Sequence, residues 1–246
     1  IKNERELTAM RQACKITAAA RALAGEMVRP GMTTKQIDKA VHDYIVSQGA
    51  KPSFLGYHGY PGSACISINN EVIHGIPSAK RFLQEGDIVK IDVGAYIGGF
   101  HGDSANTFGV GKISEEAEKL IAVTRESFFR GVKMAAKGKR VGDIGSEICG
   151  YAEGLGYGVV RKFVGHGIGR NLHEAPEVPN YGEPGRGPRL LRGMTLAVEP
   201  MVNMGKAAIR QMADGWTVKT ADGKLSAHYE NTIAITDDEP LILTSL

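Results

Sequence analysis

The chain has 246 residues, of which 30 are Lys or Arg and 27 are Asp or Glu, so its formal net charge is +3. This near balance excludes a dedicated nucleic-acid arm or an acidic tail, and a hydrophobic content of 42% excludes wholesale disorder. A chain of this length buries about 70% of its unfolded surface, so its core needs neither disulfides nor a structural metal. The three cysteines, Cys14, Cys65 and Cys149, have no short spacing, which favours a reducing compartment.

The start of the chain predicts a cytoplasmic location. Residues 2–6 are mostly charged and no apolar segment follows them, so no signal peptide is visible. No stretch approaches the ~18 apolar residues that span a bilayer, and we expect neither a membrane nor a nucleic-acid partner. The first residue is Ile1 rather than Met, which we interpret as a processed or trimmed start.

The hydrophobic pattern predicts helices over residues 3–28, 34–48, 114–136 and 143–154, and strands over 64–69, 88–96, 100–110, 195–204 and 225–236. Thr33, Ser114 and the Gly142-Asp143 pair precede three of the helices as start signals. Gly49 and Gly156 are natural helix ends. Helices that precede hairpins, without regular strand–helix alternation, predict an α+β fold with an antiparallel sheet. We expect the helices on one face of this sheet and a site on the other.

An internal repeat is visible when the chain is shifted by 107 residues. The positions that then coincide are Met27 and Met134, Gly31 and Gly138, Ile37 and Ile144, Tyr44 and Tyr151, Gly49 and Gly156, and Gly86 and Gly193. One acidic pair, Asp92 and Glu199, falls in the same register. We predict a single domain of residues 1–246, whose related halves, about 1–110 and 111–246, share a central site.

Three acidic residues stand inside apolar strand patterns, where carboxylates are rare and seldom buried without a partner. They are Asp92, Glu199 and Glu230. Salt-bridged or edge carboxylates are the alternative interpretation. A two-residue turn at Ile97 and Gly98 would place Asp92 directly opposite Asp103, with their Cβ atoms about 4.5–5.5 Å apart. Like charges this close require a cation or a proton between them.

Two histidines, His166 and His173, lie among the alternating glycines of residues 165–169 and just beyond them. Such glycines predict a strand or loop with close backbone approach, although a single histidine is more often a satisfied polar residue. His74 ends another apolar run. Four carboxylates with one or two imidazoles suit Mn²⁺, Fe²⁺, Co²⁺ or Zn²⁺ in a two-metal site, and do not suit Cu(I) or a closed structural zinc. Metals about 3.5–4 Å apart could share bridging carboxylates and activate a water for attack on a carbonyl.

Several other catalytic motifs are absent. His173-Glu174 lacks the second histidine of the helical zinc-protease motif. The segment Gly102–Asn106 is not a nucleophile elbow, because its last residue is Asn. Neither a P-loop lysine motif nor a complete dinucleotide-binding glycine motif occurs. The metal-dependent hypothesis is therefore the one that these residues favour.

The ordered donors resemble the five metal ligands of the methionine aminopeptidases; they are Asp92, Asp103, His166, Glu199 and Glu230. Their contexts match as well, in segments 90–94, 99–104, 165–169, 198–201 and 229–232. The resemblance covers essentially the whole chain and is to the short bacterial type I form within the M24 metallopeptidase superfamily. It implies the pita-bread (creatinase/aminopeptidase-like) fold, in which two pseudo-twofold-related halves surround a central antiparallel sheet.

The resemblance also implies a methionine pocket lined by Tyr57, Tyr60, Cys65 and Trp216. Leu172 stands where some bacterial members have Phe, Gly94 where some have Thr, and Asn231 where some have His. The family further implies a preference for a small second substrate residue. Its substrates would be the N-termini of nascent proteins and peptides, and it suggests a monomer with possible ribosome association.

The mechanism implied by the resemblance uses two divalent metal ions, of Co, Mn, Fe or Zn. Asp103 and Glu230 would bridge them, and a metal-bridging hydroxide would attack the first peptide carbonyl. Glu199 would shuttle a proton, His173 would stabilise the oxyanion and His74 would contact the scissile amide.

Two alternatives remain. One is an Xaa-Pro aminopeptidase or prolidase-type peptidase of the same fold, although such enzymes commonly carry an extra N-terminal domain. The other is a non-catalytic peptide-binding protein on this scaffold. Such proteins typically lose metal ligands, whereas all five are present here.

Overall fold

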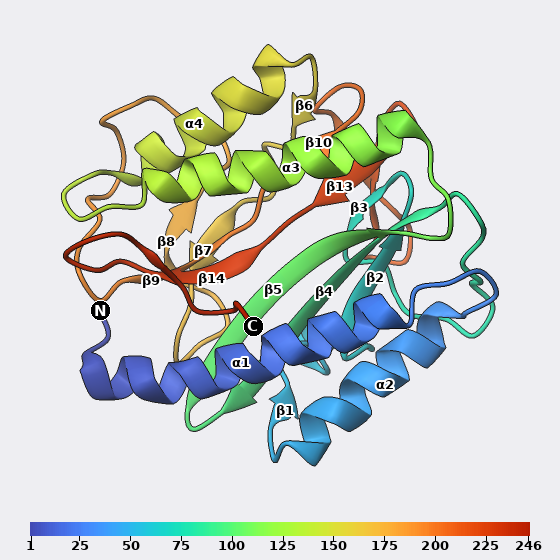
Figure 1. The fold of residues 1–246 in the computed structure, drawn as a ribbon, viewed down its shortest axis with the longest axis horizontal. Coiled ribbons are helices and arrows are strands. Elements are labelled where there is room, and N and C mark those ends of the chain that lie inside the picture. The colour runs from blue at the N-terminus through green and yellow to red at the C-terminus, as the bar shows by residue number, and fades with distance from the viewer.

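The computed structural model describes residues 1–246, which form two pairs of helices and a set of mostly short strands. The helices are α1 (Glu4–Glu26), α2 (Thr34–Ser47), α3 (Glu115–Lys133) and α4 (Val141–Gly154), with a short 3₁₀ turn at Tyr57–Gly59. In Figure 1 the pair α1 and α2 runs across the lower part of the view and the pair α3 and α4 across the upper part. No helix has the length and apolar character needed to cross a bilayer.

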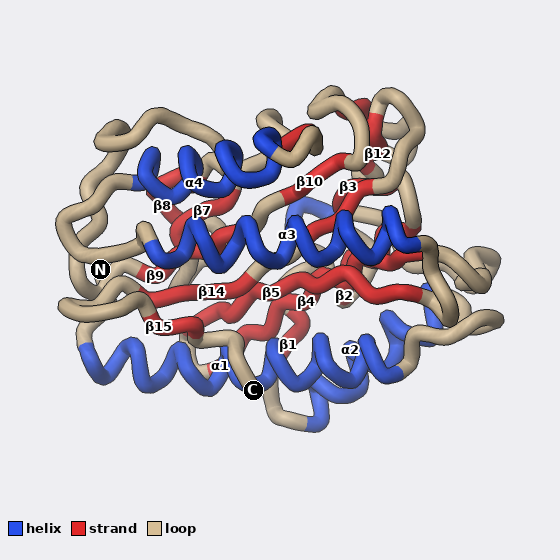
Figure 2. Tube along the Cα trace, turned by 45° about the horizontal axis from the view of Figure 1, so that its top comes forward, coloured by secondary structure: helices blue, strands red, loops and turns tan.

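The strands form four antiparallel sheets, two larger and two smaller (Figure 2). One larger sheet holds β1 (Lys51–Pro52), β2 (Ala64–Ile68), β4 (Ile88–Ile97) and β5 (Phe100–Gly109). The other has the order β15 (Leu241–Ile242), β14 (Asn231–Ala234), β9 (Thr195–Val198), β7 (Gly165–Gly167) and β8 (Glu174–Val178). The three-stranded sheets are β13 (Ser226–His228), β10 (Met201–Asn203) and β6 (Gly158–Val159), and β11 (Ile209–Gln211), β12 (Val218–Thr220) and β3 (Glu71–Ile73).

Local side chains account for where the helices begin. The Thr33 side chain accepts a hydrogen bond from the backbone of Gln36 and so caps α2, and Ser114 caps α3 in the same way. The predicted start of the fourth helix at residue 143 is wrong by two residues, because α4 begins at Val141. Asp143 serves instead as the third helical residue, and its carboxylate accepts from the backbone N–H of Arg140 at 2.7 Å.

The spacing of 107 residues recurs in the structure. Helices α2 and α4 each have 14 residues and are displaced by this number. The isolated bridges Thr33–Phe82 and Arg140–Arg189 are displaced by it as well. These coincidences fit a duplicated unit, while the division into halves at residues 1–110 and 111–246 stays a prediction.

The two strands predicted in the second half are each broken in the middle. Residues 195–204 form β9 and β10, which belong to different sheets, and residues 225–236 form β13 and β14, which are also in different sheets. Pro200 contributes to the first break because it has no backbone N–H for a ladder. Glu199 and Glu230 therefore lie at the breaks, between strands, and the prediction that they stand inside strands is wrong.

The predicted hairpin register is also wrong by two residues. The turn consists of Gly98 and Gly99, with φ of 62° and 85°, rather than Ile97 and Gly98. Consecutive glycines with positive φ are what a tight hairpin turn prefers. Asp92 consequently pairs with Ala105, and Asp103 pairs with Gly94. The two aspartates are therefore diagonal neighbours on one face of the sheet. Diagonal neighbours are farther apart than directly opposed residues, but their side chains can still interact.

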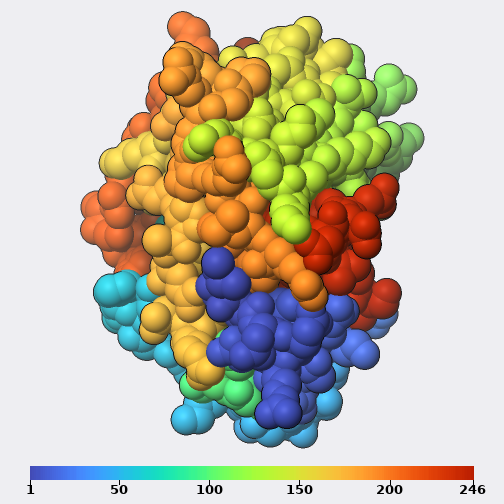
Figure 3. All heavy atoms as spheres, turned by 90° about the vertical axis from the view of Figure 1, so that its left-hand side faces the viewer, coloured from blue at the N-terminus to red at the C-terminus, as the bar shows by residue number.

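Close backbone contacts fix the helices and the N-terminus against the sheets. A Cβ added to Gly102 of β5 would lie 2.8 Å from the backbone of Cys14 in α1, so glycine permits this approach. The backbone N–H of Lys2 donates to the carbonyl of Gly193 at 2.7 Å. Figure 3 shows the result, with the first residues (dark blue) lying against the orange segment near residue 190.

Candidate metal centre

A cavity of about 240 Å³ is lined by residues from distant parts of the chain, and all the predicted site residues line it. The predicted donors at its wall are Asp92, Asp103, His166, Glu199 and Glu230, and the predicted substrate-binding residues are Tyr57, Tyr60, Cys65, His74, His173 and Trp216. None of the four α-helices contributes a residue to this wall. This agrees with the expectation that helices cover the outside and strands and loops form the site.

The acidic donors reach the cavity from both halves of the chain. Asp92 is on β4 and Asp103 on β5, whereas Glu230 comes from the break between β13 and β14. The backbones of Ala105 and Glu230 exchange two hydrogen bonds, of 3.2 and 2.9 Å, which join β5 to this break. Thr232 adds a second link, because its hydroxyl accepts from the N–H of Asp103 and donates to the carbonyl of Asp103.

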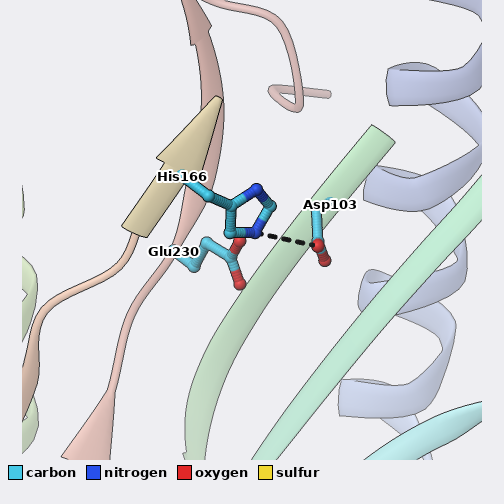
Figure 4. Close-up of side chains that lie close together, drawn as sticks. All are labelled: Asp103, His166 and Glu230. Atoms are coloured by element: carbon cyan, nitrogen blue, oxygen red, sulfur yellow. Dashed lines mark ion pairs between the residues drawn. The ribbon is translucent and has the colours of Figure 1, made fainter. Parts of the chain in front are cut away.

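Three of the donors form one compact cluster (Figure 4). Ligand atoms of Asp103, His166 and Glu230 all lie within 4.8 Å of one another. His166 Nε2 is 3.8 Å from Asp103 Oδ2 and 3.6 Å from Glu199 Oε1. These separations exceed a hydrogen bond, and they suit ligands that share a cation placed between them.

The backbone determines which nitrogen of His166 faces the carboxylates. His166 Nδ1 is 2.8 Å from the carbonyl oxygen of Gly167, to which it can only donate. In the neutral ring Nε2 then carries a lone pair. Burial lowers the pKa of His166 to about 4, so the ring is neutral near pH 7. A lone pair that points at carboxylates is the arrangement expected of a metal ligand.

An aromatic wall stands beside the donors. The hydroxyl of Tyr57 is 2.8 Å from Nδ1 of His173, and the ring of His173 lies 4.1 Å from that of His166. Tyr60 packs edge-on against Trp216 with ring centroids 5.1 Å apart. The wall is thus apolar over much of its area and carries a few polar groups near the donors, as expected of a small-ligand site.

His74 occupies a left-handed backbone position, with φ of 60°, at the end of β3. Its ring lies edge-on to Phe163 and Trp216, with centroid distances of 5.7 and 6.3 Å. Burial lowers the pKa of His74 to about 4. A neutral histidine in this strained backbone conformation is a frequent feature of functional sites.

Phe54, His58 and Leu172 also line the cavity. Residue-based reasoning missed His228, whose ligand atom lies within 4.8 Å of those of Glu199 and Glu230. The signal for His228 was its position two residues before Glu230, which places both on one side of an extended segment.

The sequence profile described as "Metallopeptidase family M24" matches residues 8–237. A methionine aminopeptidase from Clostridium perfringens is 57% identical over 244 residues, which are 99% of this chain and 98% of that protein. The crystal structure of a methionine aminopeptidase from Thermotoga maritima has 43% identity and a TM-score of 0.98, covering 100% of this chain and 99% of that one. A prolidase from Pyrococcus furiosus has 25% identity and a TM-score of 0.82, covering 100% of this chain but 65% of that one.

The chain belongs to metallopeptidase family M24. Its fold is the pita-bread fold that the resemblance implied, since the matched structures extend over the whole chain. As an M24 metallopeptidase it is a metal-dependent hydrolase that binds divalent metal.

The electrostatics of this M24 centre fit divalent cations. Burial raises the pKa of Asp92 to about 7, and burial followed by neighbouring carboxylates raises the pKa of Asp103, Glu199 and Glu230 well above the usual range. Three buried oxygens, Asp92 Oδ1, Asp103 Oδ1 and Glu230 Oε1, have no hydrogen-bond partner. Buried carboxylates require a partner or a cation, and an oxygen-rich set with one imidazole suits Mn²⁺, Fe²⁺, Co²⁺ or Zn²⁺.

Proposed function

We propose that this M24 peptidase removes the N-terminal methionine from nascent proteins and peptides. The observation that carries the proposal is that one cavity is lined both by the five predicted metal donors and by the aromatic wall beside them. The names of the relatives from Clostridium perfringens and Thermotoga maritima support the same activity. We further propose a preference for a small second residue, which follows from the family and not from the cavity.

Two divalent ions would be held by the predicted donors, which are Asp92, Asp103, His166, Glu199 and Glu230. When bound, such ions lower the pKa of water and polarise a carbonyl. The free α-amine of the substrate would lie beside the carboxylates. A substrate without a free N-terminal amine would not bind there, so the enzyme would act as an aminopeptidase. The methionine side chain would pack between Tyr60, Cys65 and Trp216.

The chain's own residues would move the protons and orient the peptide. Burial and neighbouring acids raise the pKa of Glu199, which makes its carboxylate a better base that can accept a proton and return it to the departing amine. The hydroxyl of Tyr57 lies at Nδ1 of His173 and can fix the ring so that Nε2 faces the peptide oxygen. His74, on the opposite wall, would contact the scissile amide.

Further points belong to this proposal. The physiological metal would be one of Co, Mn, Fe or Zn, since the donor set accepts all of them. We also propose that the chain acts as a monomer in the cytoplasm, in association with the ribosome.

A peptide panel tests the activity. Protein stripped by a chelator is incubated with Met-Ala-Ser, its N-acetylated form and Ala-Pro-Ala, with and without Mn²⁺ or Co²⁺. We expect metal-dependent release of methionine from the first peptide alone, because acetylation removes the free amine. Cleavage of Ala-Pro-Ala alone would instead favour the Xaa-Pro peptidase, and no cleavage by the metal-loaded protein would favour a binding protein.

A further inference from the structure

His228 is a buried histidine that the five-donor set does not include. It ends β13, is 1% exposed and precedes Glu230 by two residues. Thr107 of β5 fixes its backbone, because the Thr107 hydroxyl donates to the carbonyl of His228 at 2.8 Å and accepts from its N–H at 2.9 Å. The ring does not line the cavity that Glu199 and Glu230 line, so it lies behind their carboxylates.

The carboxylate of Glu199 lies between two imidazoles. Its Oε1 is 3.6 Å from Nε2 of His166, and its Oε2 is 3.7 Å from Nε2 of His228. Oε2 of Glu230 is 3.9 Å from the same nitrogen of His228. The Oε2 atoms of both glutamates, which are called their outer oxygens, therefore face one ring nitrogen, at separations that exceed a hydrogen bond.

The two imidazoles differ in which nitrogen carries the proton. Nδ1 of His166 has the carbonyl of Gly167 as its acceptor, so Nε2 is left with the lone pair. Nδ1 of His228 has no partner, and neither has Nε2. In His228 the proton is favoured on Nε2, because that nitrogen faces carboxylate oxygens whereas Nδ1 has no acceptor. His166 thus presents a metal-binding lone pair, whereas His228 presents an N–H donor.

We propose that His228 is a positioning residue whose Nε2–H group holds the outer carboxylate oxygens of Glu199 and Glu230. This inference rests on the proposed metal centre. By holding the Oε2 atoms, the ring determines which oxygen of each glutamate is turned toward the metal. Mutation of a residue that orients a metal ligand in this way typically lowers metal affinity by about 10–100-fold. A nitrogen that carries its proton toward the carboxylates cannot itself coordinate, so His228 is not a sixth ligand.

Two substitutions test the donor role. His228→Leu removes both nitrogens at similar size, whereas His228→Gln keeps an N–H donor on a chain of comparable reach. His42→Leu serves as the matched control, because His42 contacts Ser63 at 2.9 Å and lies outside the cavity. The measurements are the affinity for Mn²⁺ by calorimetry, the visible absorption of the Co²⁺-loaded protein, and the free energy of unfolding in a chelator.

We expect His228→Leu to bind Mn²⁺ about 10–100-fold more weakly and to change the Co²⁺ spectrum, while His228→Gln stays within about threefold of the wild type. The free energy of unfolding in the chelator shows whether both variants fold, so that a weaker affinity for Mn²⁺ is not the result of an unfolded chain. Wild-type affinity and spectrum in His228→Leu would overturn the proposal, and so would equal losses in both variants. Release of methionine is assayed separately, so a wild type that binds Mn²⁺ without releasing methionine refutes the proposed function alone.

Discussion

The buried carboxyl of Asp92 predicts how the stability of the metal-stripped protein depends on pH. Burial raises its pKa from 3.8 to about 7. Between these values the folded chain holds a proton that the unfolded chain has released, so the free energy of unfolding falls as pH rises from about 4 to about 7. This is the reverse of the usual behaviour of a paired carboxylate, which stabilises the fold as pH rises.

The size of this effect follows from the pKa values. At about 1.4 kcal/mol per unit of pKa, the change at Asp92 corresponds to about 4 kcal/mol above pH 7. Asp103, Glu199 and Glu230 act in the same direction, because burial also raises their pKa. Asp92→Asn removes one of these charges, so in a chelator at pH 8 it should be more stable than the wild type, by up to about 4 kcal/mol. At pH 4 the two should be nearly equal.

Urea unfolding at several pH values, with a chelator and then with excess Mn²⁺, measures these differences. Mn²⁺ should stabilise the wild type more than Asp92→Asn and should remove its loss of stability above pH 7. Asp222→Asn is the control, because backbone N–H groups of Lys206 and Lys224 lower the pKa of this exposed carboxyl. Asp222→Asn should therefore lower the free energy of unfolding instead of raising it, and this effect should disappear as the pH falls below the lowered pKa of Asp222. A metal-stripped wild type that becomes more stable from pH 5 to pH 8 would refute the reasoning.

Three further substitutions have defined outcomes. Asp103→Asn should abolish methionine release and weaken Mn²⁺ binding with an unchanged circular dichroism spectrum, whereas normal turnover at full metal content would contradict a bridging role. His173→Ala should lower kcat by about 10²–10³, the scale of one lost oxyanion donor; an effect on KM alone would remove that role. Gly75→Ala should lower the free energy of unfolding by about 1–3 kcal/mol, because its Cβ would lie 2.3 Å from the carbonyl oxygen of Ile66. Chemical denaturation checks this, and an unchanged midpoint would argue against the contact.

Local signals predicted the helices well because their physical causes are local. Thr33 and Ser114 cap the helices that they were expected to begin. The sheets depend on contacts between distant segments, which a strand pattern does not contain. The apolar run around Glu199 and Pro200 looks continuous in sequence, yet its two ends pair with different sheets.

In the site, too, local signals were predictable from the sequence and contacts between distant segments were not. The carboxylates were predictable because a charge within an apolar run is costly without a partner. The hairpin register was not, because the Gly98-Gly99 pair moves the turn by one residue and so displaces Asp103 from its expected partner. His228 was missed because its position two residues before Glu230 does not by itself reveal that its ring lies behind two glutamates.

The most direct test of the central claim relates the rate of methionine release from Met-Ala-Ser to the metal bound per chain. Metal-stripped wild type and Asp103→Asn are titrated with Mn²⁺, bound metal is counted by elemental analysis and free methionine by mass spectrometry. The account predicts that the wild-type rate rises from near zero in step with bound metal, and that the variant binds less metal and releases almost no methionine. A wild type that releases methionine at full rate without metal, or releases none at full occupancy, would contradict it.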